Sequence, residues 1–99
     1  MSQEAIISAF QQQASNVDPL GAKIKFVLDE HAIIIDGTQD NNDVRVSDAE
    51  EEADCTISTT MEDFMKLKNG DLNPMMAVMT GKVKIKGDMG LAMKLQSLI

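Results

Sequence analysis

The chain has 99 residues, a length that accommodates one domain around a single hydrophobic core, so we expect residues 1–99 to form one domain. Hydrophobic residues make up 43% of the chain and charged residues 25%, a balance that excludes wholesale disorder and a fibrous repeat. The net charge of -7 arises between Asp36 and Asp54, where eight acidic residues face one arginine. Without a basic face, the chain is not expected to bind nucleic acid.

Two hydrophobic periodicities divide the chain into helices and strands. Apolar residues spaced three or four apart indicate amphipathic helices, and strict alternation indicates strands with one buried face. The predicted helices cover residues 6–17, 61–68, 74–80 and 89–98. The predicted strands cover residues 24–28, 32–36, 44–46, 53–59 and 82–86, the first two close enough to pair as a hairpin.

The two central helices have clear end signals. Thr60, or Thr59 beside it, is suited to cap the first of them, and Gly70 to end it. Asn73 and Pro74 are suited to the cap and first position of the second, and Gly81 to its end. The acidic stretch before the fourth strand, which includes Glu50-Glu51-Glu52, is predicted to be a solvated loop.

Neither a metal site nor a catalytic centre is expected. Asp36 to Asp43 superficially resembles a calcium loop, but its glycine comes second rather than sixth and Ser47 stands where a bidentate Glu is needed. Cys55 is predicted to be a buried structural thiol, and His31 an exposed residue at the hairpin turn. One Cys and one His exclude an internal disulfide and a Cys/His zinc cluster, so we expect no cofactor and no enzyme activity.

The second half of the chain resembles the sterol carrier protein type two family. The resemblance lies in the run ADCTIS at residues 53–58 and in the order of segments over residues 61–98, including NPMM, GKVKIKGD and MGLAMKLQSL. It implies an α+β fold: a five-stranded mixed sheet with helices on one face, enclosing a hydrophobic tunnel. It also implies binding and transfer of an apolar lipid, such as a sterol, a fatty acid, a fatty acyl-CoA or a phospholipid.

Methionines are concentrated where such a tunnel would lie. The chain has eight Met but three Phe and no Trp or Tyr, and six of the Met fall after residue 64. Thioether side chains adapt to ligands of varied shape better than rigid aromatic rings do. The expected lipid-lining residues are Phe26, Ile35, Phe64, Met65, Met75, Met76, Met79, Ile85, Met89, Leu91 and Met93.

Lys82, Lys84 and Lys86 alternate along the last predicted strand. They are expected to lie in water, with a contact to an anionic membrane or a lipid head group as the sharper hypothesis. Transient contact with lipid-metabolising enzymes and a monomeric state are also expected. The alternatives are a module whose apolar groove receives a partner protein or a second copy, and acyl transfer or hydrolysis using Cys55, His31 or a carboxylate.

The expected location is the cytoplasm. The N-terminus MSQEAIISAF lacks the features of a secretory signal, and no stretch has the roughly 18 apolar residues of a membrane span. The final residues Ser97-Leu98-Ile99 lack the basic residue of a peroxisomal address.

Overall fold

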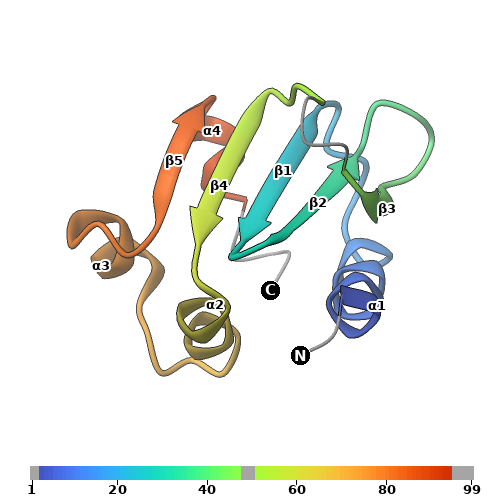
Figure 1. The fold of residues 1–99 in the computed structure, drawn as a ribbon. Helices are drawn as coiled ribbons and strands as arrows, with labels where there is room; N and C mark the ends of the chain where they lie inside the picture. Colours follow the sequence, from blue (N-terminus) through green and yellow to red (C-terminus); the bar gives the residue numbers. More distant parts are fainter. Residues whose placement is uncertain (1–2, 48–50, 95–99) are drawn as a thin grey trace.

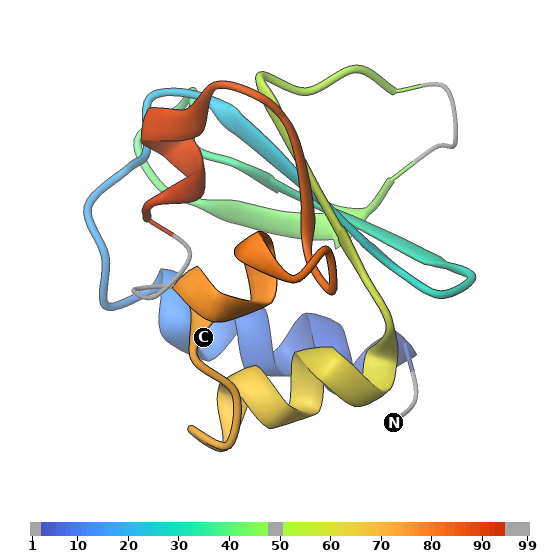
Figure 2. The same cartoon turned by 90° about the vertical axis from the view of Figure 1, so that its left-hand side faces the viewer.

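The computed structural model describes residues 3–47 and 51–94. Its elements are α1 (Gln3–Ala14), β1 (Lys23–Leu28), β2 (His31–Asp36), β3 (Asp43–Val46), β4 (Cys55–Thr59), α2 (Met61–Lys68), α3 (Pro74–Met79), β5 (Lys84–Gly87) and α4 (Met89–Ala92). The strands form one sheet in the order β3-β2-β1-β4-β5, and the helices gather on one face of it (Figures 1 and 2). The predicted five-stranded mixed sheet is confirmed.

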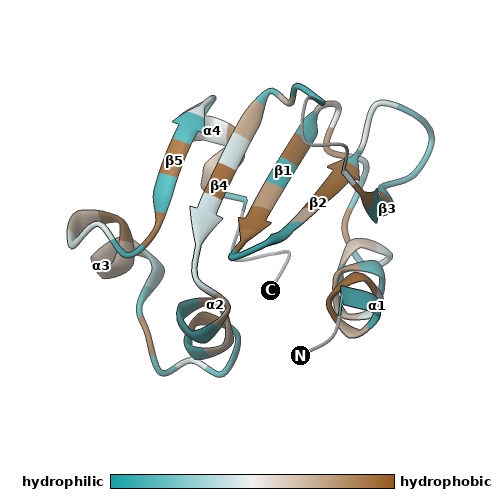
Figure 3. Cartoon of the chain, in the orientation of Figure 1, coloured by the Kyte–Doolittle hydropathy of each residue, from teal (hydrophilic) through white to brown (hydrophobic). Residues whose placement is uncertain are grey.

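The sheet is mixed because its central pair, β1 and β4, runs parallel while every other pair is antiparallel. Ile24 lies beside Cys55 and Phe26 beside Ile57 in this pair, and all four side chains are buried. Apolar and polar residues alternate along β1 and β5 (Figure 3), so one face of each strand packs against the helices.

The three phenylalanines of the chain pack together between the helices and the sheet. The ring of Phe10, from α1, lies 4.7 Å from the ring of Phe26 in β1 and 5.4 Å from that of Phe64 in α2, both in tilted arrangements. All three are buried. Such aromatic pairs contribute about 0.5–1.5 kcal/mol beyond the burial of their area, so this cluster fixes α1 and α2 on the sheet.

The last predicted strand begins two residues later than its alternation indicates. The amides of Lys82 and Val83 donate to the carbonyl of Ala77 at 2.9 and 3.1 Å, which closes the C-terminal turn of α3. Gly81 allows this turn because its φ is +79°. Of the predicted helix over residues 89–98, the structure describes α4 and the turn at Met93 and Lys94, and residues 95–98 lie outside the described part.

Glu51 corrects the prediction of a wholly solvated acidic loop. Its carboxylate accepts two hydrogen bonds from Arg45, of 2.8 and 2.7 Å, and its carbonyl accepts one from Lys25 Nζ at 3.3 Å. Lys25 and Ile34 are paired neighbours on the sheet face away from the helices, and both are buried. Glu51 is therefore fixed to the sheet by Lys25 and Arg45 and does not lie free in solvent.

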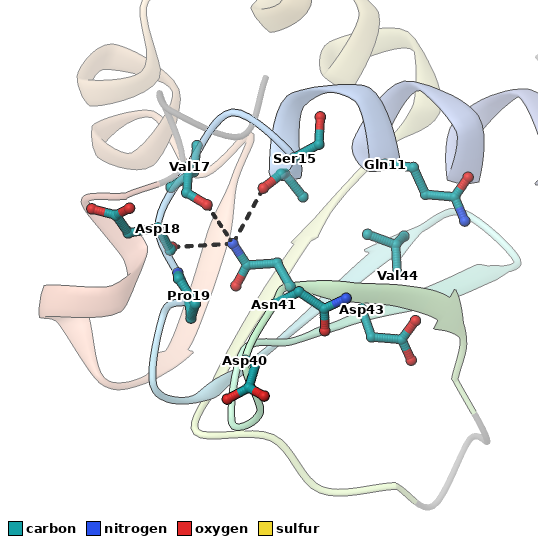
Figure 4. Close-up of a pocket in the computed structure, with 11 residues that line it drawn as sticks. Gln11, Ser15, Val17, Asp18, Pro19, Asp40, Asn41, Asp43 and Val44 are labelled. Atoms are coloured by element: carbon teal, nitrogen blue, oxygen red, sulfur yellow. Dashed lines mark hydrogen bonds between the residues drawn. The ribbon is translucent and has the colours of Figure 1, made fainter.

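Asn42 connects the loop after α1 to the start of β3. Its side-chain amide donates to the carbonyls of Ala14, Val17 and Asp18 at 3.3, 3.1 and 3.1 Å, drawn as dashed lines in Figure 4. Its Oδ1 accepts from the amide of Leu20 at 3.0 Å. One side chain thus joins the C-terminal end of α1, at Ala14, to the loop that follows it.

We predict that Asn42→Ala lowers the free energy of unfolding by about 2–3 kcal/mol, because part-buried backbone groups lose their partner. Urea denaturation measures the change. Asn41→Ala, the adjacent exposed position, is the control and is expected to stay within about 0.5 kcal/mol of the wild type. Equal stability of the two variants would contradict the bracing role of Asn42.

Asp36 gives the fold a pH-dependent contribution. Its carboxylate accepts from the Oγ1 and the amide of Thr38, and these bonds hold its pKa below the ordinary value, helped by the charges of Lys23 and Arg45. Because the pKa is lower in the folded state than in the unfolded state, the stabilisation is complete above the unfolded pKa. It is lost as pH falls through the folded pKa.

We predict that Thr38→Val raises the pKa of Asp36 and destabilises the protein at neutral pH, with the difference from wild type vanishing once Asp36 is protonated. Carbon-detected NMR titration reports the pKa of Asp36. Urea unfolding, at neutral pH and at a pH low enough to protonate Asp36, reports the free energy of unfolding. Gln39→Ala, at the neighbouring exposed position, is the control. A destabilisation by Thr38→Val that is independent of pH would show that the Thr38 hydroxyl does not act through the charge of Asp36.

Candidate functional site

An apolar pocket of about 250 Å³ opens between α3, β5 and α4. Its walls are formed by apolar side chains from all three elements. The lining residues are Pro74, Met75, Val78, Met79, Ile85, Met89, Ala92 and Met93. The pocket is thus built almost entirely from thioether and aliphatic groups, which offer an apolar ligand an adaptable surface.

Two capped helices present these side chains. Asn73 Oδ1 accepts from the amides of Met75 and Met76 at 2.9 and 3.4 Å, and Pro74 occupies the first turn, so α3 starts at a defined position. Asp88 Oδ1 accepts from the amide of Gly90 at 2.8 Å and fixes the start of α4 in the same way. The predicted Asn73 cap is confirmed.

Gly87 brings α4 close to the sheet. Its φ is +106°, and a Cβ at this position would collide with the carbonyl oxygen of Asp54 and crowd the Cα of Cys55. The next amide, that of Asp88, donates to the same Asp54 carbonyl at 2.9 Å. Glycine at this position therefore allows α4 to turn back over β4 and β5 and to form one wall of the pocket.

The methionines around the pocket are unusually exposed. Met75, Met79, Met89 and Met93 expose between 56% and 78% of their surface. Contiguous exposed apolar side chains of this kind mark binding surfaces more often than solvated ones. Because the methionines surround the opening, they can contact both a ligand in the pocket and whatever covers it.

The structure distributes the predicted lining residues over three environments. The pocket is lined by Met75, Met79, Ile85, Met89 and Met93. The packed core holds Phe26, Ile35, Phe64 and Leu91, with Met65 half-buried against it. Met76 is exposed on α3, outside the pocket lining.

Three further lining residues were missed by the sequence reasoning. Pro74 and Val78 are one helical turn apart and share the face of α3 that Met75 and Met79 border, so helical spacing was an available signal. Ala92 lines the pocket and also belongs to the core. No sequence pattern indicated that Ala92 would contact both the pocket and the core.

The lysines of the last strand lie at the same edge of the sheet as the pocket. Lys84 and Lys86 are exposed and lie on the opposite face of β5 from Ile85, paired with Ser58 and Thr56 of β4. Lys82 is also exposed, in the turn before β5. The prediction that all three point into water is confirmed.

Cys55 and His31 differ in how well they match their predictions. Cys55 is fully buried as predicted, and burial, with a smaller effect from the charge of Asp88, raises the pKa of its thiol. His31 is not an exposed turn residue. It opens β2, its Nδ1 lies 3.2 Å from Gln3 Oε1 of α1, and its side chain is 21% exposed. The hairpin turn is formed by Asp29 and Glu30, which leaves His31 next to the helix.

A second, polar hollow of about 370 Å³ lies between the end of α1 and the loop before β3. Carboxylates of Asp18, Asp40 and Asp43 surround it (Figure 4), and the Asn42 brace crosses it. Within residues 3–47 and 51–94, no group of three or more His, Cys, Asp or Glu side chains is arranged to hold a metal ion. In the same ranges, no helix combines the length and apolar character needed to cross a bilayer.

Curated relatives match part of the chain. Sterol carrier protein 2 of Rattus norvegicus is 53% identical over 51 residues, 52% of this chain and 9% of the relative. Hydroxysteroid dehydrogenase-like protein 2 of Homo sapiens is 51% identical over 49 residues, 50% of this chain and 12% of the relative. The chain spans at most about an eighth of the length of these relatives, in segments covering 9% and 12% of them.

Solved structures match the chain over nearly its whole length. The crystal structure of sterol carrier protein 2 like 2 from Aedes aegypti superposes with a TM-score of 0.74 at 26% identity, covering 97% of this chain and 94% of that one. The solution structure of the palmitated form has a TM-score of 0.70 at 27% identity, covering 97% and 92%. The model of the SCP-2 sterol transfer family matches residues 4–99. The protein therefore belongs to the SCP-2 sterol transfer family.

Proposed function

We propose that this chain, as one domain, binds the apolar part of a lipid in the pocket between α3, β5 and α4, and carries it between membranes or to lipid-metabolising enzymes. The observation that carries the proposal is the pocket itself, with its thioether and aliphatic lining. Membership of the SCP-2 sterol transfer family and the palmitated state of an Aedes aegypti relative support it. Sterols, fatty acids, fatty acyl-CoA and phospholipids all present a suitable apolar surface.

The energetics of burial are sufficient without any catalytic group. Burying about 400 Å² of apolar ligand surface contributes about 10 kcal/mol before losses of translational and chain entropy. A volume of about 250 Å³ lies just below the usual size of small-molecule sites. The ligand therefore enters by displacing methionine side chains, whose unbranched rotamers make this inexpensive.

Some of the predicted lipid-lining residues are buried in the core, and we propose that a ligand contacts them only after α4 moves. Ala92 is shared between the pocket wall and the core, and Leu91 beside it is buried. A longer lipid reaches Phe26, Ile35, Phe64 and Met65 only if α4 moves away from β4 and β5. Because α4 forms one wall of the pocket and packs over β4 and β5, we propose it as the moving element during exchange.

The chemistry of the remaining candidates favours a carrier over an enzyme. Burial raises the pKa of the Cys55 thiol, so the reactive thiolate is disfavoured at neutral pH. His31 lies near Gln3, the first residue of α1, while the pocket lies at the β5 edge of the sheet. Neither Cys55 nor His31 lines the pocket.

We predict that Met79→Gln weakens binding of a fluorescent long-chain fatty acid about tenfold, because a side-chain amide in an apolar pocket loses part of its hydration. Fluorescence titration measures Kd. Met76→Gln is the matched control on the same helix, since Met76 is exposed but lies outside the lining; its Kd is expected to stay within about twofold of wild type. Equal losses in both variants would remove α3 from the binding site.

Native mass spectrometry of the wild type tests the proposal more broadly. Co-purification or uptake of one lipid per chain is expected. A chain that takes up no fatty acid, sterol or phospholipid, and instead forms a dimer or holds a partner protein, would replace the carrier function with the interaction module.

A further inference from the structure

Oxidisable side chains are concentrated at the mouth of the pocket. Within residues 3–47 and 51–94, five methionines are strongly exposed, and four of them line the pocket. These four form the methionine rim: Met75, Met79, Met89 and Met93. The fifth, Met76, lies outside the lining, while Met61 and Met65 are half-buried against the core. Most of the exposed thioether groups therefore border the place where an apolar ligand is proposed to lie.

A peroxide oxidises a thioether without help from any other protein group. The sulfur lone pair attacks one peroxide oxygen, the O–O bond breaks and an S=O bond forms, and hydrogen peroxide leaves as water. The product, methionine sulfoxide, is polar and chiral. A methionine sulfoxide reductase restores the thioether using two thiols, which become a disulfide as water is released. Methionine oxidation is thus a reversible chemical change of the side chain.

The one thiol of the chain is a poor competitor for the oxidant. A thiolate reacts with peroxides more readily than a thiol does. Cys55 is fully buried, and this burial raises the pKa of its thiol. The thiolate is therefore scarce at neutral pH, and the sulfur is shielded from solvent. A dissolved peroxide reaches the methionine rim first, because its sulfurs belong to the exposed side chains.

Sulfoxides at the methionine rim would change the polarity of the pocket. The other lining residues, Pro74, Val78, Ile85 and Ala92, have no side-chain hydrogen-bond donor. A sulfoxide oxygen covered by an apolar ligand would lose its hydration without gaining a partner, which is unfavourable. The effect has the same origin as that predicted for Met79→Gln, but oxidation can alter all four side chains of the rim.

We propose that the methionine rim is a reversible oxidation site, at which a peroxide converts thioethers to sulfoxides and prevents a lipid from binding until a reductase restores them. This inference rests on the proposed function and adds a regulation of the same pocket. Ligand and oxidant oppose each other, because a lipid in the pocket covers the sulfurs that the peroxide must reach. An empty carrier is therefore oxidised, whereas a loaded carrier is protected.

Peptide mapping by mass spectrometry tests where oxidation occurs. Hydrogen peroxide is added with and without a long-chain fatty acid at about ten times its Kd, a concentration that leaves about a tenth of the chains empty. Sulfoxide formation at Met79 and Met93 is expected to slow about tenfold when the ligand is present. Met76 is the internal control, and its rate is expected to stay within about twofold, since it lies outside the lining.

Titration with the fluorescent fatty acid tests what oxidation does. Peroxide treatment is expected to raise the Kd of wild type about tenfold or more, and a methionine sulfoxide reductase with dithiothreitol is expected to reverse the change. The rim variant carries Met75→Leu, Met79→Leu, Met89→Leu and Met93→Leu. Because leucine has no sulfur, the ratio of its Kd after and before peroxide is expected to stay within about twofold. The matched control, Met61→Leu/Met76→Leu, is expected to show the ratio of wild type.

Three outcomes would overturn the oxidation proposal. They are a wild-type Kd unchanged despite sulfoxides at the rim, equal loss of binding in wild type and the rim variant, and equal oxidation of the rim with and without ligand. Far-UV circular dichroism of the oxidised protein is expected to match that of the untreated protein, and loss of this signal would assign the loss of binding to unfolding instead. Absence of fatty-acid binding before peroxide is added would contradict the proposed function itself, so the two failures are distinguishable.

Discussion

The packing of Phe10 of α1 against Phe26 of the sheet and against Phe64 of α2 is the contact on which the rest of the structure depends. It uses every aromatic side chain of the chain, since Trp and Tyr are absent. The layer between helices and sheet is therefore rigidly filled beneath α1 and α2, and must be completed elsewhere by aliphatic and thioether groups. Around α3, β5 and α4 those groups leave an open volume of about 250 Å³. The pocket thus lies in the part of the helix–sheet layer that contains no aromatic side chain.

The opposite face of the sheet carries the buried pair Lys25 and Ile34 at its centre and the exposed Lys84 and Lys86 at its β5 edge. The Glu51 carboxylate is held by Arg45 and its carbonyl by Lys25, so this residue of the acidic segment is fixed to β1 and β3. The lysines of β5 lie at the far edge of the same sheet. The strand order therefore places the Glu51–Arg45 ion pair at β3 and the exposed lysines of β5 at opposite edges of the sheet.

Periodicity was enough to predict which segments form strands and which form helices, because the faces of β1, β4 and α1 that meet the core follow the expected spacings of two and of three to four. It misplaced some ends: α1 spans Gln3–Ala14 rather than residues 6–17, and β4 begins at Cys55 rather than at residue 53. It could not predict which inward-facing side chains lie in the packed core and which line the pocket. Phe26 and Ile85 both face the helices, but Phe26 meets Phe10 in the core and Ile85 meets the pocket, and this difference depends on which helix lies above each strand. The sequence also could not show that the Ala77 carbonyl captures Lys82 and Val83, that Glu51 reaches Arg45, or that His31 meets Gln3, because each contact joins segments whose approach is decided by the assembled fold.

The central claim is that lipid enters the methionine-lined half of the helix–sheet layer. Methyl NMR of protein labelled with ¹³C at the methionine methyls, recorded while a long-chain fatty acid is added, tests it most directly. The account predicts large shift changes at Met75, Met79, Met89 and Met93, and small ones at Met61 and Met76. Saturable binding that leaves those four methyls unchanged would contradict it.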